Sequence, residues 1–483
     1  MRTILVTAFL AVFGCSAADG TAIVPPTSDA ALDGASPIED SAVEMPDAKV
    51  APPPVDRPAI ACTDSIDSVY VAPSVLLPMS NALRGDVVRC AAKGDLTIQE
   101  TSDRLVAKNI AIKAVYAVHE YRIAFRTLKR DGSAAISTAR VLLPDTKSAV
   151  DEAVLIAHPT DGIADACVPS KKDTANDELA LAWAAIGRPV IVPDYVGLGN
   201  DGIQAYLDNR EQGQTILDGG RALDDLLAHG AFSKLMVVGY SQGGGAALSA
   251  QALEKTYGTS GKLVGVVAYA PEWPIDPGSF GYDAILANPN GLTVTTGLSK
   301  SSIAVMRAYA YFANTLGLGH ATDGFPESKR AGFQNALDSL CLVPFGGYLQ
   351  GTAFKLGDLV DDTLRTTLLS CIQTKGATCI EPGKGFYPYL QANVLHADPA
   401  GAPVVIVQGS LDQILLPNEE AACIRTKLVQ DGLTPELCVD GSATHQSIID
   451  KQGDFAVKWG VAAFSGAPHP TCATTQLPAC SRP

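Results

Sequence analysis

Between residues 115 and 270, short apolar runs alternate with segments whose apolar residues recur at helical spacing. The first two runs, Val115–Leu128 and Ala135–Leu143, are rich in β-branched and aromatic residues and predict paired strands near a sheet edge. Later runs are apolar throughout, as expected of strands that are buried on both faces. These runs are 153–157, 189–192, 235–239 and 263–269, and the helical segments are 178–186, 214–229 and one that begins at Gln242. The pattern predicts an α/β fold with a mostly parallel central sheet flanked by helices.

The alternation stops between Pro271 and Pro403, where the pattern is mostly helical with Gly/Pro breaks. It resumes with an apolar run at 404–407, a helical segment at 418–430 and a last helix at 448–464. An insertion at one point of such a sheet is typical of a lid or cap. We therefore expect a core of residues 59–270 and 400–483 and a mainly helical lid of residues 271–399.

The N-terminal residues have the features of an export signal. Arg2 precedes the apolar run Ile4–Phe13, which is too short to span a bilayer. The run ends in Val12-Phe-Gly-Cys15, which resembles a bacterial lipobox; cleavage at another small residue nearby is the alternative. We expect a signal peptide over residues 1–15 that leaves Cys15 lipidated, and export to the cell envelope or beyond. Residues 16–58, rich in Ala, Pro, Ser and Asp, are expected to form a disordered tether.

Composition and charge limit the possible partners. The 483 residues are 47% hydrophobic and 18% charged, which allows a large core and argues against disorder over most of the chain. The formal net charge is -15. Because an acidic surface repels phosphate backbones, nucleic acid is not an expected partner.

The cysteine content also favours export. Eleven cysteines less Cys15 leave ten, an even number that allows five disulfides in an oxidising compartment. No C-x-x-C pair is present, so neither a zinc site nor a thioredoxin-like site is predicted. The sequence does not fix the pairing. Pairs close enough along the chain to bridge locally are Cys371/Cys379, Cys423/Cys438 and Cys472/Cys480.

The strongest motif is Gly239-Tyr-Ser241-Gln-Gly243, a G-x-S-x-G pattern that follows an apolar strand and opens a helix. This is the context of the nucleophile elbow of α/β-hydrolases. Small neighbours let the Ser occupy a strained strand-to-helix turn, and the N-terminus of the new helix favours developing negative charge. A Gly-rich turn without chemistry is the alternative. We expect Ser241 to be a nucleophile.

A serine nucleophile needs a base, and the chain has seven histidines. The chain order Ser, acid, His of this fold excludes the three histidines before Ser241. His445 lies in a polar loop between the strand-like Glu436–Val439 and the last helix, a position that suits a base. His320 and His396 fall in the insertion and His469 in a Pro-rich tail, so we expect them to serve packing or the surface.

The acid should follow the strand before the base. Asp412 lies just after the apolar run at 404–407, at the carboxyl end of a predicted parallel strand. Its rival is Asp440, five residues before His445, whereas Asp398 precedes the strand. We favour Asp412 as the residue that orients His445.

Acyl transfer also requires an oxyanion hole with two N–H donors. One should be the backbone amide of Gln242, next to the nucleophile. The other should come from the loop His158-Pro-Thr-Asp-Gly162, and we expect it to be the amide of Asp161, with Thr160 as the alternative. His158 is expected to support this loop rather than to act as a base.

At these positions the sequence resembles the secretory lipase family, which includes fungal lipase A-type enzymes and bacterial relatives. The resemblance covers about residues 60 to 465. It implies an α/β-hydrolase with a helical lid and without a cofactor, which cleaves carboxylic esters, often acylglycerols. It also implies a disulfide that ties the loop at Cys167 to another part of the chain. Relatives often carry Gly-Thr-Thr where this chain has Pro159-Thr-Asp. The matching segments, in order, are Thr160-Asp-Gly162 with Cys167-Val-Pro-Ser170, Pro193-Asp-Tyr195-Val-Gly-Leu-Gly199, Gly239 to Gly244, and Gly409-Ser-Leu-Asp412 with His445.

The sequence thus predicts a serine hydrolase that acts on an ester with an apolar acyl group, with neither a metal nor a cofactor. Two other functions use the same features. The same three side chains serve amide or peptide cleavage, which the insertion disfavours because its apolar residues lack clustered carboxylates to anchor a peptide amine. A binding domain without catalytic activity would be expected to lack at least one of the side chains Ser241, Asp412 and His445.

Overall fold

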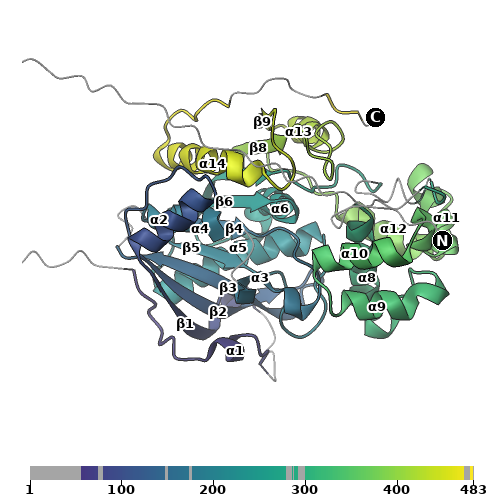
Figure 1. Cartoon of the computed structure of the whole chain (residues 1–483), viewed down its shortest axis with the longest axis horizontal. Helices are drawn as coiled ribbons and strands as arrows, with labels where there is room; N and C mark the ends of the chain where they lie inside the picture. Colours follow the sequence, from purple (N-terminus) through teal and green to yellow (C-terminus); the bar gives the residue numbers. More distant parts are fainter. Residues whose placement is uncertain are drawn as a thin grey trace, which may run out of the picture. The chain divides into compact units, whose positions relative to one another are not determined.

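One sheet, with the strand order β1-β2-β3-β5-β4-β6-β7-β8-β9, forms the centre of the protein in a computed structural model (Figure 1). The structure describes residues 56–73, 80–146, 151–172, 177–278, 286, 288–291, 300–472 and 479–481. The expected signal peptide (1–15) and all but the last three residues of the expected tether (16–58) lie outside these residues.

The sheet is antiparallel at one edge and parallel elsewhere. β1 (Val87–Leu96), β2 (Val118–Leu128) and β3 (Ala134–Pro144) pair antiparallel, and β3 also pairs antiparallel with β5 (Val190–Pro193). The other strands pair in parallel, which confirms the predicted α/β fold. They are β4 (Glu152–Ala157), β6 (Lys234–Tyr240), β7 (Lys262–Tyr269), β8 (Val404–Gly409) and β9 (Glu436–Asp440).

Helices cover both faces of the sheet. One apolar cluster includes α5 (Asn209–Leu227), α6 (Gln242–Tyr257) and α13 (Ala421–Gln430), and another includes α2 (Ile98–Ala107), α4 (Asp177–Ala185) and α14 (Ile448–Ser465). In β4, Leu155 belongs to the first cluster and Val154 to the second, because successive side chains of a strand point to opposite faces. Burial on both faces explains why the parallel strands have apolar residues at successive positions along most of their length.

A helical insertion separates β7 from β8, as predicted. Its helices, green in Figure 1, lie together, and we call residues 300–392 the cap. The cap has its own apolar core, which also includes Tyr206, Ile414 and Leu415 from loops of the α/β core. The cap therefore packs against the loops that follow the parallel strands. Its helices are α8 (Lys300–Leu316), α9 (Arg330–Leu337), α10 (Leu342–Thr352), α11 (Asp362–Gln373) and α12 (Gly383–Ala392).

Short helical turns complete the described chain. Two are four-residue helices, α1 (Ile66–Val69) and α3 (Pro169–Lys172). The others are 3₁₀ turns at Asn81–Leu83, Asp165–Cys167, Leu318–His320, Glu327–Lys329 and Leu356–Asp358. Within the described residues, no helix is both long enough and apolar enough to cross a bilayer.

Four disulfides join described cysteines, namely Cys62–Cys90, Cys167–Cys341, Cys371–Cys379 and Cys423–Cys480. The local pair Cys371/Cys379 is therefore confirmed, and Cys167 has the partner that the family resemblance implied. The pairs Cys423/Cys438 and Cys472/Cys480 were wrong. The reason is that Cys480 lies beside α13, where it bonds to Cys423, and Ser481 donates its N–H at 2.9 Å to the carbonyl of Asn418, just before α13.

Candidate active site

Ser241 lies in the sharp turn between β6 and α6. Its φ and ψ are 57° and -117°, a conformation that side chains rarely adopt and that costs about 1–3 kcal/mol. Backbone bonds hold it there: its N–H donates to the carbonyl of Tyr269 at 2.9 Å, and its carbonyl accepts from the N–H of Glu272 at 3.0 Å. The sequence context of a nucleophile elbow is thus matched by elbow geometry.

The glycines around Ser241 are required by close backbone contacts. A Cβ on Gly239 would lie 2.0 Å from the carbonyl oxygen of Gly243. A Cβ on Gly243 would lie 1.9 Å from the carbonyl oxygen of Ala157, at the end of β4. Since no side chain fits at these positions, the turn brings α6 directly against the loop that follows β4.

His445 lies beside the Ser241 hydroxyl, in the loop between β9 and α14. Its Nε2 is 3.0 Å from Ser241 Oγ, and its Nδ1 is 2.7 Å from Asp412 Oδ2. The carbonyl of His445 accepts a hydrogen bond from the Tyr240 hydroxyl at 2.7 Å, and the two rings lie 5.1 Å apart. Because a carboxylate only accepts, Asp412 favours the tautomer with hydrogen on Nδ1, which leaves Nε2 to accept from the serine hydroxyl.

Asp412 is buried just after β8, and both oxygens of its carboxylate accept hydrogen bonds. Oδ1 accepts the N–H groups of Ile414 and Leu415, each at 2.9 Å, and Oδ2 accepts from Gln408 Nε2 at 2.9 Å as well as from His445. These donors stabilise the charged form and fix its direction. The charge of Asp412 adds to burial, the larger cause, in raising the pKa of Tyr240.

The rival acids have other partners. Asp440 accepts from Ser442 with Oδ1 and from Gln452 Nε2 with Oδ2, at 2.6 Å for the latter. Asp398 accepts the N–H of Ala400 through Oδ1. The carboxylate that the structure brings to His445 is that of Asp412.

The loop 158–162 approaches the first turn of α6 through side chains. The Thr160 hydroxyl donates to Gln242 Oε1 at 3.0 Å and also lies 2.8 Å from the Tyr206 hydroxyl. Thr160 has a single hydroxyl hydrogen, so the Tyr206 hydroxyl must donate to Thr160. The two segments expected to supply oxyanion N–H groups, the loop 158–162 and Gln242, are therefore hydrogen-bonded to each other.

The cap holds the other side of this loop. The carbonyl of Asp161 accepts the N–H of Leu342 at the start of α10, at 2.8 Å. The adjacent residue, Cys341, forms the disulfide with Cys167. These contacts fix the Asp161 backbone between the core and the cap, while its assignment as an oxyanion donor stays a prediction.

The other histidines have partners away from Ser241. His158 is buried, its Nδ1 lies 2.7 Å from the carbonyl of Pro159, and burial lowers its pKa to about 4. His158 therefore stays neutral near pH 7 and lies within the loop that it was expected to support. The remaining five pair with nearby carboxylates: His119 with Asp95 and Asp145, His229 with Asp151, His320 with Asp323, His396 with Asp431 and His469 with Glu436.

Sequence reasoning missed two buried polar residues near the site. Tyr206 contacts Thr160, and Glu272 follows β7 and binds the Ser241 carbonyl through its backbone. Both Glu272 carboxyl oxygens are buried without a hydrogen-bond partner among the described residues. Burial raises the pKa of Glu272 to about 8, Arg307 of α8 opposes the rise, and Glu420 adds to it. No local motif marks either residue, since both act through contacts distant in sequence.

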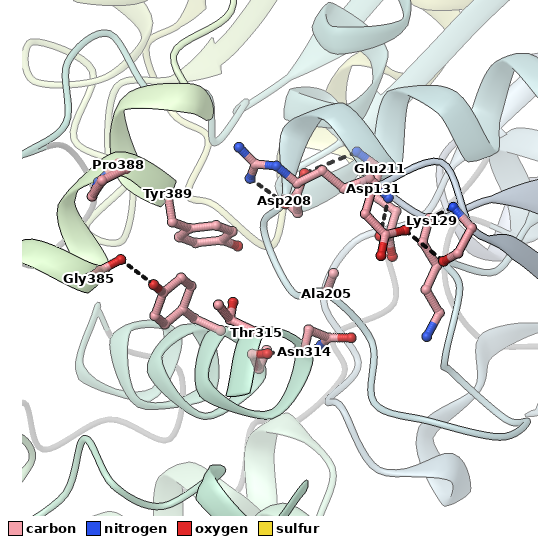
Figure 2. A pocket seen from close by; sticks show the side chains of 14 residues that line it. Lys129, Asp131, Ala205, Asp208, Glu211, Asn314, Thr315, Gly385, Pro388 and Tyr389 are labelled. Atoms are coloured by element: carbon pink, nitrogen blue, oxygen red, sulfur yellow. Dashed lines mark hydrogen bonds and ion pairs between the residues drawn. The ribbon is translucent and has the colours of Figure 1, made fainter. Parts of the chain in front are cut away.

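A pocket of about 640 Å³ lies between the core and the cap but does not include Ser241, Asp412 or His445 (Figure 2). The β2–β3 turn, the start of α5 and cap helices α8 and α12 line it. Arg130 donates to Asp208 at 2.6 Å, and the Tyr311 hydroxyl donates to the carbonyl of Gly385.

No group of three or more His, Cys, Asp or Glu side chains that could hold a metal ion occurs among the described residues.

Residues 174–275, which include the Ser241 turn, match the family model described as "Secretory lipase". The resemblance to the secretory lipase family is confirmed. A lipase or esterase is therefore the class of enzyme to which this chain is related. The secretory lipase match and the four disulfides together support secretion. Among curated proteins, no sequence matches this one significantly.

Solved structures share the fold at low sequence identity. Candida antarctica lipase A in its closed state is 18% identical, with a TM-score of 0.59 over 82% of this chain and 86% of that chain. The rice cell wall degrading esterase LipA from Xanthomonas oryzae is 18% identical, with a TM-score of 0.59 over 79% of this chain and 97% of that chain. A putative hydrolase from Legionella pneumophila is 17% identical, with a TM-score of 0.58 over 76% and 96%. These likenesses show that the chain shares the α/β fold of these three proteins.

Proposed function

We propose that this protein is an exported serine hydrolase of carboxylic esters, with Ser241 as nucleophile, His445 as general base and Asp412 as the group that orients His445. One observation carries the proposal. A continuous hydrogen-bonded chain runs from Asp412 Oδ2 to His445, at 2.7 Å, and from His445 Nε2 to Ser241 Oγ, at 3.0 Å. This is the arrangement that makes a serine hydroxyl reactive toward acyl carbon.

In the acylation step, His445 Nε2 takes the hydroxyl proton as Ser241 Oγ attacks the ester carbon. Asp412 stabilises the imidazolium that forms, through the hydrogen bond to Nδ1, and does not take the proton itself. His445 then gives the proton to the departing alcohol, which leaves an acyl group on Ser241. Water attacks this acyl-enzyme by the same route in reverse, with His445 again as base, and releases the acid.

The tetrahedral intermediates carry negative charge on the former carbonyl oxygen. We assign its stabilisation to the backbone N–H of Gln242, at the N-terminus of α6, and to the N–H of Asp161. The Gln242 assignment is supported by the position of this amide in the first turn, whose N–H groups have no acceptor within the helix. The Asp161 assignment is supported by the contact between Thr160 and Gln242 and by the bond from Leu342 to the Asp161 carbonyl.

An apolar acyl group is the substrate feature that the site favours. The cap packs Ile163, Ile414 and Leu415, which closely follow Asp161 and Asp412 in sequence, into one apolar cluster with its own helices. Tyr206, whose hydroxyl contacts Thr160, belongs to the same cluster. Burying an apolar chain there is favourable by about 25 cal/mol per Å² of surface removed from water. The Candida antarctica protein of similar fold is described as a lipase and the Xanthomonas oryzae protein as an esterase, so both ester classes belong in the test.

The test is hydrolysis of p-nitrophenyl esters from acetate to palmitate, with and without an emulsion, by the purified full chain and by Ser241→Ala. We expect turnover by the wild type with an acyl-enzyme burst, and a loss of at least ~10³-fold in Ser241→Ala. Ser465→Ala, at an exposed serine at the end of α14, is the matched control and should keep full activity. Faster cleavage of matched p-nitroanilides would favour an amidase or peptidase, and no turnover of any ester would overturn the proposal.

We further propose that Cys15 anchors the exported protein through a lipid. The support is the lipobox-like Val12-Phe-Gly-Cys15 after the apolar run, in residues outside those that the structure describes. Growth with an alkyne fatty acid should label the wild type and not Cys15→Ser, and the variant should shift from the membrane to the soluble fraction. Equal labelling or equal distribution of the two proteins would contradict the anchor.

A further inference from the structure

Two described cysteines, Cys438 on β9 and Cys472 in the segment after α14, are not joined by a disulfide, whereas eight others form four. They lie next to each other. Both line one cavity of about 480 Å³, and Cys472 packs against the apolar cluster that contains Cys438. Burial, followed by a hydrogen bond with Cys472, raises the pKa of the Cys438 thiol. The two sulfur atoms are therefore within reach of each other although 34 residues separate them.

The chain around Cys472 is already held at its far end. Cys480 is bonded to Cys423 of α13, and the Ser481 N–H donates to the carbonyl of Asn418. Closer to α14, His469 Nδ1 lies 3.2 Å from Glu436 Oε1 at the start of β9. The His469–Glu436 contact, three residues before Cys472, thus holds this part of the chain beside β9 and limits the separation that the two thiols can adopt.

We propose that Cys438 and Cys472 form a fifth disulfide in the exported protein, which fastens the segment after α14 to β9. The local environment favours this use of the two thiols over a metal site, because the described residues contain no group of three metal-binding side chains. It also disfavours a reactive thiolate, because such a group needs a lowered pKa and Cys438 has a raised one.

The bond forms by exchange with the disulfide of a thiol oxidase of the export compartment. The thiolate of Cys472, which is the more exposed of the two, attacks one sulfur of the oxidase disulfide and forms a mixed disulfide. Cys438 then loses its thiol proton as its sulfur attacks the Cys472 sulfur, and displaces the oxidase. The two electrons and two protons end on the oxidase, which leaves as a dithiol, so the exchange balances.

The bond would brace the structure behind the proposed base. β9 ends at Asp440, and His445 follows in the next loop. The same segment is bonded to α13, which follows the loop of Asp412. A disulfide that closes a 34-residue loop restricts the unfolded chain, so its loss should lower the Tm of the oxidised protein by roughly 5 °C.

The experiment maps the thiols of the full chain, purified from an oxidising compartment and denatured in iodoacetamide without reductant. We expect a Cys438–Cys472 cross-linked peptide and no alkylation of either cysteine, with the Cys371–Cys379 peptide as an internal control. Full alkylation of Cys438 and Cys472, or a peptide that joins either to another cysteine, overturns the proposal.

A paired set of variants adds a second readout. Cys438→Ala/Cys472→Ala should lower the Tm of the oxidised protein, and should leave the Tm of protein produced under reducing conditions almost unchanged. Equal effects under both conditions would mean that the two side chains contribute packing alone. Because the peptide map uses the wild type, a variant that fails to fold does not decide the outcome. The result is also independent of ester hydrolysis, so this inference and the proposed function can fail separately.

Discussion

The Thr160 hydroxyl donates a hydrogen bond to the side-chain oxygen of Gln242, 3.0 Å away, and so joins the loop after β4 to the first residue of α6. Both segments are assigned oxyanion donors in the proposed mechanism. Because such donors act only when they are held in place before reaction, this bond is expected to contribute to rate rather than to substrate binding.

Thr160→Val should therefore lower kcat about tenfold with little change in KM, which is less than the ~10²–10³-fold cost of deleting an oxyanion donor outright. The change keeps the shape of the side chain and removes both of its hydrogen bonds. Thr160→Ser is the matched control and should retain most of the activity. The measurement is kcat and KM on a p-nitrophenyl ester, with inhibition by a boronic acid analogue of the transition state. Equal kcat in the Val and Ser variants would contradict a positioning role.

Asp412→Asn should reduce kcat by roughly 10⁴-fold, the scale known for loss of the orienting carboxylate in serine hydrolases. The Asp412 carboxylate accepts four hydrogen bonds through two oxygens. An amide can place only one oxygen there, so its NH₂ group must face N–H donors in either orientation. The measurement is steady-state hydrolysis, with circular dichroism as a check on folding.

Asp440→Asn is the control for that change. Asp440 is five residues from His445 in sequence, but its partners are Ser442 and Gln452. Its replacement should change kcat less than about fivefold, since it does not touch the imidazole. If Asp440→Asn were the more damaging of the two, the assignment of Asp412 would be wrong.

The central strands and the position of Ser241 were predictable because their signals are local. A parallel strand buried on both faces has a continuous apolar run, as β4 has after Glu152 and β6 after Lys234, and the residues that follow such strands meet at one edge of the sheet. Chain order could rank Asp412 above Asp440. It could not show which carboxylate faces the imidazole, because this depends on Gln452, which holds Asp440 elsewhere.

Other features were not predictable because they depend on distant contacts. β1 was missed, since half of its residues are exposed and polar residues interrupt its pattern. The Cys423–Cys480 bond was missed because it requires the path of the chain after α14, which no local spacing encodes. The contacts of Thr160 with Tyr206 and Gln242 span 46 and 82 residues, so no motif marks them.

Gly243→Ala should lower the Tm by more than roughly 5 °C or prevent folding, because the new Cβ would lie 1.9 Å from the carbonyl oxygen of Ala157. This oxygen belongs to the backbone of a buried strand and cannot move aside. Gly347→Ala in α10 is the matched control, since nothing lies within 4 Å of its Cβ. Because Ala favours a helix over Gly by about 1 kcal/mol, the control should be neutral or stabilising. Thermal unfolding measures both variants, and similar Tm losses would contradict the steric argument.

Glu272→Gln should change how stability depends on pH. Burial raises the pKa of Glu272 to about 8 from an ordinary value of 4.5, so the folded protein holds this proton at pH values where the unfolded chain has lost it. A raised carboxyl pKa gives stability that is complete below about pH 4.5 and is lost as the pH rises toward 8. In that window the wild type should lose about 1.4 kcal/mol of unfolding free energy per pH unit through this one group.

The difference between the two proteins isolates Glu272 from other groups that titrate in this window. Asp194 and Asp218, each with a pKa raised to about 6 by burial, are present in both proteins, and His158, whose pKa is lowered to about 4, acts with the opposite sign. At pH 5 a protonated Glu and a Gln are nearly isosteric, so the two unfolding free energies should be similar. By pH 7.5 the Gln variant should be the more stable, because it has no proton to lose. Urea unfolding without reductant at pH 5.0, 6.0 and 7.5 measures the difference in unfolding free energy between the two proteins. If this difference is the same at all three pH values, Glu272 is ionised throughout and is stabilised by Arg307.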